Sequence, residues 1–247
     1  AAAVAASASL LTGCETGSTL SRADAPHVLT GDQLPGLIGV APNLIVGFAH
    51  VRIDDEPVWR QIPVQVDERK VVGFGSQPAN NSTPGVTGTV YGNGSAGVTA
   101  LQYADAGTWV GADTTPAFDA ADELVFMVGD AGGVKQAGDP AEPAGVVPGS
   151  GRRVDLTDPL AAGTAGAVYL FRSAGALTPS ADKDYVNYQF RLTSGAYKTT
   201  YKRATGPNPE TSQVTTANYT IGYSDRWYED RWTIAGGTGV DILDGNK

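Results

Sequence analysis

Cysteine and histidine are nearly absent from this chain of 247 residues, which has one cysteine, Cys14, and two histidines, His27 and His50. So few ligands exclude a zinc site of the usual cysteine and histidine composition. A single cysteine also excludes an internal disulfide. His27 lies in a predicted tether, so a serine hydrolase would depend on His50, and no G-x-S-x-G motif is present. The simplest interpretation of His50 is a half-buried strand residue.

The chain also lacks an excess of positive charge and any long apolar run. It has 17 Lys+Arg against 26 Asp+Glu, and residues 1–151 hold only 6 of the former against 16 of the latter. A nucleic acid partner is therefore excluded, because a phosphate backbone requires a basic face. No apolar run approaches the ~20 residues that a membrane-spanning helix needs.

The single cysteine lies in the motif Leu11-Thr12-Gly13-Cys14, which follows an apolar, alanine-rich stretch. This arrangement resembles the lipobox of bacterial lipoproteins, in which the cysteine is lipidated and becomes the new N-terminus. The resemblance implies an extracytoplasmic protein that is anchored to a membrane by lipid at Cys14. It makes residues 1–13 the remnant of a signal peptide. Residues 14–35 are polar and predict a flexible tether. We expect a fragment that is cut at both ends, because no initiator methionine and no C-terminal signal are present.

Short alternating segments separated by glycine and proline dominate the remaining sequence. Residues 43–53 and 58–66 predict two antiparallel strands, and residues 124–128 predict a central strand that is buried on both faces. The sequence predicts an all-β fold that resembles a β-sandwich, with short antiparallel strands and long Gly/Pro-rich loops. Residues 36–247 would form this β-rich domain, and 131–151 is the best boundary if it consists of two units.

Acidic residues flank the predicted central strand. Calcium takes six to eight oxygen ligands from carboxylates and carbonyls, so this concentration of acids favours a calcium site. The spacing does not match an EF-hand loop, and the alternative interpretation is a solvated acidic turn. The predicted ligands are Asp113, Asp119, Asp122, Glu123 and Asp130.

A basic window at residues 185–209 contains no acid, although the chain as a whole is acidic. Lysine neutralises carboxylates and tyrosine rings stack on sugars, so this window predicts binding of an anionic polysaccharide. If the protein is an enzyme, a polysaccharide lyase fits best, with tyrosine as acid or base and lysine neutralising the uronate. The alternative is a sheet edge protected by lysines. The binding candidates are Arg191, Lys198, Lys202 and Arg203, and the weak catalytic candidates are Tyr197, Tyr201, Lys198 and Lys202.

Residues 223–232 concentrate aromatic and charged side chains. Trp227 and Trp232 offer flat apolar faces to sugar C–H groups, with acids and arginines beside them for hydroxyls. Burial of both tryptophans at strand ends is an equally good interpretation.

These observations predict a surface-anchored protein that binds, and in one version degrades, an extracellular anionic polysaccharide. A structural or adhesive envelope module without catalytic activity is the main alternative. A third hypothesis is an enzyme whose catalytic half lies beyond Lys247.

Overall fold

The computed structural model consists of antiparallel strands and short 3-10 turns, without an α-helix among the residues that it describes. This confirms the predicted all-β, sandwich-like class. Nowhere in the described part is a helix long and apolar enough to cross a membrane. The 3-10 turns are η1 (Gly31–Gln33), η2 (Pro42–Leu44) and η3 (Val128–Asp130). The described residues are 15–73, 99–106, 110–180, 185–195, 208–225, 228–235 and 237–243.

The chain divides into two compact units, each built from two separate segments. Unit 1 contains Ala1–Val66 and Leu124–Ser180, and unit 2 contains Asp67–Glu123 and Ala181–Lys247. Residues 131–151, where the sequence favours a boundary, lie inside unit 1.

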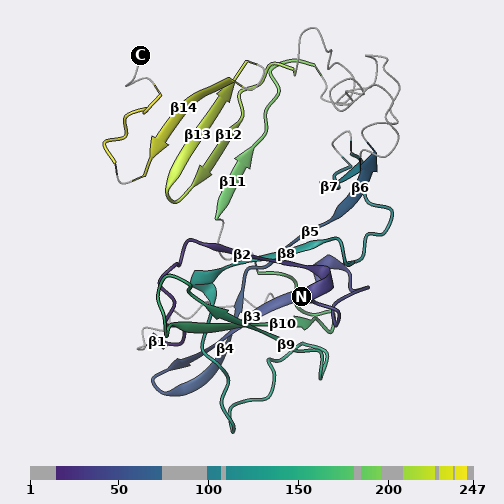
Figure 1. The fold of residues 1–247 in the computed structure, drawn as a ribbon, viewed down its shortest axis with the longest axis vertical. Coiled ribbons are helices and arrows are strands. Elements are labelled where there is room, and N and C mark those ends of the chain that lie inside the picture. Colours follow the sequence, from purple (N-terminus) through teal and green to yellow (C-terminus); the bar gives the residue numbers. More distant parts are fainter. Residues whose placement is uncertain are drawn as a thin grey trace, which may run out of the picture. The chain divides into compact units, whose positions relative to one another are not determined.

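Unit 1 is organised around a five-stranded antiparallel sheet with the order β1-β3-β10-β9, in which β4 also pairs with β3 (Figure 1). The turn between β3 and β4 consists of Asp54 and Asp55, whose φ angles are 50° and 66°. A two-residue loop with positive φ at both positions matches the twist of the flanking strands. The strands are β1 (Glu15–Thr16), β3 (Ile45–Ile53), β4 (Glu56–Ile62), β9 (Arg152–Thr157) and β10 (Ala165–Arg172).

The core of unit 1 lies on β3 and β10, whose central residues are buried on both faces. Their register places Phe48 opposite Tyr169. The half-buried Trp59 packs edge-on against Tyr169 and Phe171, with ring centroids 4.9 and 5.8 Å away. The buried members of this cluster are Val46, Phe48, Val146, Ala167, Tyr169 and Phe171.

A second sheet of three strands has the order β2-β8-β5, with β2 at Pro26–Thr30, β8 at Glu123–Met127 and β5 at Gln65–Asp67. In β8, Leu124 and Phe126 are buried, whereas their neighbours are only half-buried. The expectation that this strand is covered on both faces was therefore wrong. Only one face of β8 packs against the core. The strands of unit 1 that are buried on both faces are β3 and β10.

Part of the stretch 14–35, which the sequence predicts to be a tether, belongs to the sheets of unit 1. β1 pairs with β3, and β2 pairs with β8. Leu29 and Leu34 are buried, and the ring of His27 lies 5.2 Å from that of Phe126. Strand pairing uses backbone groups, so a polar segment can join a sheet when a few apolar side chains reach the core.

Unit 2 contains a two-stranded and a four-stranded antiparallel sheet. In the first, β6 (Arg69–Gly73) pairs with β7 (Thr99–Tyr103). The second has the order β11-β12-β13-β14. Its strands are β11 (Val186–Gln189), β12 (Gln213–Thr216), β13 (Tyr219–Ser224) and β14 (Tyr228–Ile234).

Candidate functional site

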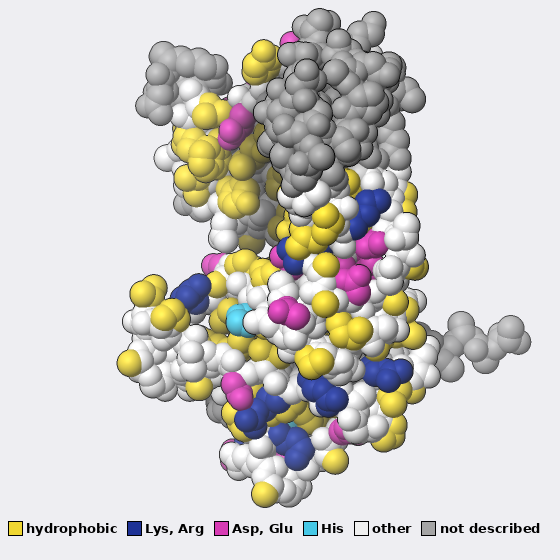
Figure 2. Space-filling model, turned by 45° about the vertical axis from the view of Figure 1, so that its right-hand side comes forward, with side chains coloured by type: hydrophobic (Ala, Val, Ile, Leu, Met, Phe, Trp, Pro, Cys, Tyr) yellow, Lys and Arg dark blue, Asp and Glu magenta, His cyan; other side chains and the backbone are white. Residues whose placement is uncertain are grey.

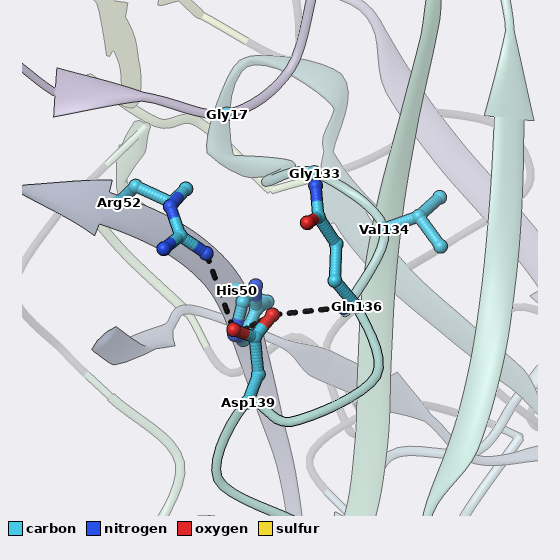
Figure 3. Close-up of a pocket in the computed structure, with 7 residues that line it drawn as sticks. All are labelled: Gly17, His50, Arg52, Gly133, Val134, Gln136 and Asp139. Carbon is cyan, nitrogen blue, oxygen red and sulfur yellow. Dashed lines mark hydrogen bonds and ion pairs between the residues drawn. The ribbon is translucent and has the colours of Figure 1, made fainter. Parts of the chain in front are cut away.

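A cavity of about 340 Å³ lies beside the C-terminal half of β3 in unit 1 (Figure 3). His50 and Arg52 are two residues apart on this strand and therefore lie on the same face. The remaining wall comes from the end of β1 and from the loop after β8. The cavity is lined by Gly17, His50, Arg52, Gly133, Val134, Gln136 and Asp139.

A glycine, Gly132, allows the loop to approach β3 this closely. The amide of Gly133 donates a hydrogen bond to the carbonyl oxygen of His50 at 2.8 Å. A Cβ atom at Gly132 would lie only 2.2 Å from that same oxygen. Only glycine fits at such a backbone contact, so Gly132 fixes the distance between the loop and His50.

His50 is the buried polar group of the cavity, with an exposed fraction of 3%. Its ring packs edge-on against the ring of Trp59, its cross-strand neighbour, with the ring centroids 4.9 Å apart. Its Nε2 atom is buried, makes no hydrogen bond, and lies 3.5 Å from Oδ2 of Asp139. Burial lowers the pKa of His50; Asp139 opposes this shift, and the charges of Lys135 and Arg52 reinforce it.

Asp139 is held in place by two hydrogen-bond donors of unit 1. It accepts hydrogen bonds from the Gln136 amide at 2.8 Å and from Nη1 of Arg52 at 3.2 Å. The bond from Gln136 is the largest cause that lowers the pKa of Asp139, with smaller contributions from Arg52 and His50. At neutral pH the cavity thus contains an ionised carboxylate beside a neutral imidazole.

The arrangement can bind a polar molecule. Figure 3 shows the side chains of Arg52 and Gln136 on either side of the cavity, with His50 and Asp139 between them. The side chain of Arg52 is 34% exposed and can reach a ligand as well as Asp139. No serine, threonine or cysteine is among the described residues that line the cavity, so these residues offer no hydroxyl or thiol nucleophile.

The basic window predicted from the sequence is described only in part. Arg191 follows β11, and its Nη2 atom donates a hydrogen bond to Oε1 of Gln189 at 2.7 Å. The candidates Tyr197, Lys198, Tyr201, Lys202 and Arg203 lie outside the described residues, as do Trp227 and Cys14. Their predicted roles stay predictions.

Trp232 belongs to an apolar row that crosses the four-stranded sheet of unit 2. The register places Tyr188 beside Val214, Val214 beside Ile221, and Ile221 beside Trp232. Tyr188 is 58% exposed and Trp232 is 38% exposed. Figure 2 shows hydrophobic side chains gathered over this sheet. The alternate positions of β11 and β12, such as Gln189 and Gln213, are polar. The sheet is therefore amphipathic, and much of its apolar face is accessible.

Two predicted calcium ligands, Asp113 and Asp122, gather with Glu68, with one carboxylate oxygen of each lying within 4.8 Å of the others. Burial, followed by the charges of Asp122, Asp113 and Asp119, raises the pKa of Glu68 to about 7. The carboxylate of Asp119 accepts a hydrogen bond from the Ala121 amide at 2.7 Å. This bond within the loop is typical of an aspartate that stabilises a turn.

The other two predicted ligands are placed differently. Glu123 forms an ion pair with Arg69 and accepts a hydrogen bond from the Tyr103 hydroxyl at 2.9 Å. Asp130 is buried in η3 of unit 1, whereas the other four acids belong to unit 2.

Sequence reasoning did not single out Glu68, Arg52 or Asp139. Glu68 stands in Asp67-Glu68-Arg69-Lys70, which is typical of a solvated turn. Asp139 lies in a Gly/Pro-rich loop, 89 residues after His50, and no local pattern indicates that they meet.

No protein-family model matches this chain, and no curated protein or solved structure matches it either.

Proposed function

We propose that this protein binds an extracellular polysaccharide and that sugar hydroxyls occupy the cavity beside His50. The observation that carries the proposal is the buried Nε2 atom of His50, which makes no hydrogen bond although it borders a cavity. A buried polar atom without a partner is costly, so a ligand that supplies one gains affinity.

A sugar hydroxyl suits this position because it both donates and accepts. One hydroxyl can donate to or accept from Nε2 of His50, whichever tautomer is present, and can also donate to the carboxylate of Asp139. Arg52 and the side-chain amide of Gln136 supply further donors to neighbouring hydroxyl oxygens. A volume of about 340 Å³ is at the lower end of small-molecule sites, which suits a terminal or protruding sugar unit.

Binding to a panel of neutral and anionic polysaccharides tests this proposal. Gln136→Ala and Arg52→Ala should each weaken binding about tenfold, because each removes a hydrogen bond worth ~1 kcal/mol or more. Arg172→Ala is the matched control, since Arg172 is exposed on β10 and does not line the cavity. Unchanged affinity in both cavity variants would contradict the assignment of the cavity.

The apolar row of unit 2 is a second candidate surface for the same polymer. Exposed aromatic rings such as Tyr188 and Trp232 can stack on the C–H faces of sugars. Tyr188→Ala combined with Trp232→Ala should abolish this contact and leave the cavity intact. Comparing these variants with the cavity variants shows which unit holds the glycan.

The membrane anchor is part of the proposal because of the lipobox motif. In a bacterial host, the precursor should incorporate a labelled fatty acid, and Cys14→Ser should remove the label and the membrane attachment. If no polysaccharide binds at all, a structural or adhesive envelope module becomes the better description.

A further inference from the structure

Three carboxylates of unit 2 meet at one place although they are distant in sequence. Glu68 lies between β5 and β6, whereas Asp113 and Asp122 lie in the segment between β7 and β8. One carboxylate oxygen from each lies within 4.8 Å of the other two. These residues belong to the same compact unit, so the cluster does not depend on how the two units are arranged.

Backbone hydrogen bonds position these carboxylates. Oδ1 of Asp122 accepts from the Arg69 amide at 2.8 Å, and Oδ2 accepts from the Asp119 amide at 2.7 Å. Oδ1 of Asp113 accepts from the Thr115 amide at 3.0 Å. Each bonded oxygen retains a lone pair, so the carboxylates are oriented and can still act as ligands.

The carboxylate of Glu68 gives a second indication of a bound ligand, independent of the clustering of the three acids. Both of its oxygens, Oε1 and Oε2, are buried and have no hydrogen-bond partner. An ionised carboxylate in such a position is unfavourable unless a positive charge joins it. Glu68 as a whole is half-buried, whereas Asp122 beside it is completely buried, with an exposed fraction of 0%.

The nearby basic side chains do not supply that charge. Arg69 directs its guanidinium to Glu123 and to the Ala121 carbonyl oxygen, which lies 2.6 Å from Nε. The ammonium group of Lys70 donates to the Ala112 carbonyl oxygen at 2.7 Å. Within the described part of the chain, no ion pair reaches Glu68, Asp113 or Asp122.

We infer that Glu68, Asp113 and Asp122 form a Ca²⁺ site in unit 2, separate from the sugar cavity of unit 1. All three donors are carboxylate oxygens, which hard cations prefer. Oxygens bound to one Ca²⁺ at 2.3–2.6 Å lie at most ~5 Å apart, and the oxygens of this cluster meet that limit. Carbonyl oxygens or water complete the coordination, and we expect a dissociation constant of about 10⁻⁴–10⁻³ M, typical of extracellular modules.

Calcium titration by calorimetry, together with thermal melts in calcium and in chelator, tests the site. The parent protein should bind one Ca²⁺ at this site and melt at a higher temperature in millimolar calcium, because ligands stabilise the state that binds them. Glu68→Gln should abolish both effects. Its matched control is Glu229→Gln, which changes an exposed glutamate on β14 of the same unit and should behave like the parent.

The same variant provides a readout that a purely structural role would not give. In chelator, Glu68→Gln should melt at a higher temperature than the parent, because it removes a buried charge that has no partner. In calcium the order should reverse. The inference is overturned if calcium leaves the melting temperature of the parent unchanged, or if Glu68→Gln responds to calcium as the parent does. The cavity variants that test glycan binding lie in unit 1. A negative result for calcium binding would therefore not contradict the glycan proposal.

Discussion

The two units of this protein differ in how far their apolar side chains are buried. In unit 1, the central residues of β3 and β10 are buried on both faces, and aromatic rings pack edge-on around Trp59. In unit 2, every residue of β11 is exposed and β14 has one half-buried residue among seven. Both regions have the alternation or the apolar runs expected of strands. A strand pattern therefore predicts which side chains share a face, but the neighbouring elements decide whether that face becomes core or accessible surface.

The largest expected effect contrasts an aromatic residue from each unit. Phe171→Ala should lower the free energy of unfolding by about 3–5 kcal/mol, because it leaves a cavity in a closely packed core. Tyr188→Ala should cost about 0.5 kcal/mol or less, as is usual for exposed positions. Urea unfolding of both variants measures the difference. An equal loss in the two variants would mean that the apolar face of unit 2 is covered in the folded protein.

A smaller effect is expected where the loop meets β3. Gly132→Ala should cost about 1–3 kcal/mol, because its Cβ must displace the His50 carbonyl oxygen from 2.2 Å. It should also weaken sugar binding by shifting His50 relative to Asp139. If Gly132→Ala binds and unfolds like the parent, the close backbone contact does not shape the cavity.

The pH dependence of stability reports on Glu68. Its pKa is raised from an ordinary value of 4.5 to about 7 in the folded, calcium-free protein. The folded state therefore holds this proton more tightly than the unfolded state does. The resulting stabilisation is complete below pH 4.5 and is lost as the pH rises to about 7. Glu68 should thus make the calcium-free protein less stable at neutral pH than in mild acid.

Unfolding in chelator between about pH 4.5 and pH 7.5 checks this dependence, since this range spans both pKa values of Glu68. The free energy of unfolding should decrease across this range in the parent and stay flatter in Glu68→Gln, which cannot ionise. Calcium at the upper end of the range should restore stability in the parent alone. The same slope in the parent and in Glu68→Gln would assign the titration to other groups.

The smallest effect on stability is expected in the basic window of unit 2. Lys198→Ala combined with Lys202→Ala should change the free energy of unfolding by less than ~1 kcal/mol per residue, as for most exposed charges. If these lysines bind an anionic polysaccharide, the double variant should lose that binding, and binding by the parent should weaken with salt.

A lyase would make a further observation possible. Its products carry a new double bond that absorbs in the ultraviolet, and Tyr197→Phe or Tyr201→Phe should reduce turnover more than binding. Anionic polysaccharide binding that is equal in the parent and in the double lysine variant would indicate that the lysines only protect a sheet edge.

Local pattern predicted the strands of unit 1 well, and proline explains one difference. The predicted strands at residues 43–53 and 58–66 correspond to β3, β4 and β5. The second prediction is split because Pro63 has no N–H group to donate, so β4 ends at Ile62 and β5 begins at Gln65. The turn between β3 and β4 was also predictable, since aspartates tolerate the positive φ angles it needs.

The candidate metal site was predictable only in part. Acid density indicated Asp113 and Asp122, but it could not separate them from Glu123, which Arg69 neutralises. Glu68 was missed because it stands in a short run of two acids followed by two bases. Only contacts between distant segments, such as the hydrogen bond from the Arg69 amide to Asp122, bring it to the cluster. Ion pairing and burial are decided by contacts between distant segments, which local composition does not record.

By itself, the sequence determined the all-β class, the approximate strands, the acidic character and the residue types available for chemistry. These properties follow from side-chain periodicity, turn residues and charge, which act over a few neighbouring residues. Only the tertiary structure decided that His50 meets Asp139 and that Glu68 joins Asp113 and Asp122. It also decided that the core of unit 1 is closed while the apolar row of unit 2 is accessible. The physical reason is that desolvation and charge pairing depend on which distant segments the fold places in contact, and strand periodicity is compatible with many such arrangements.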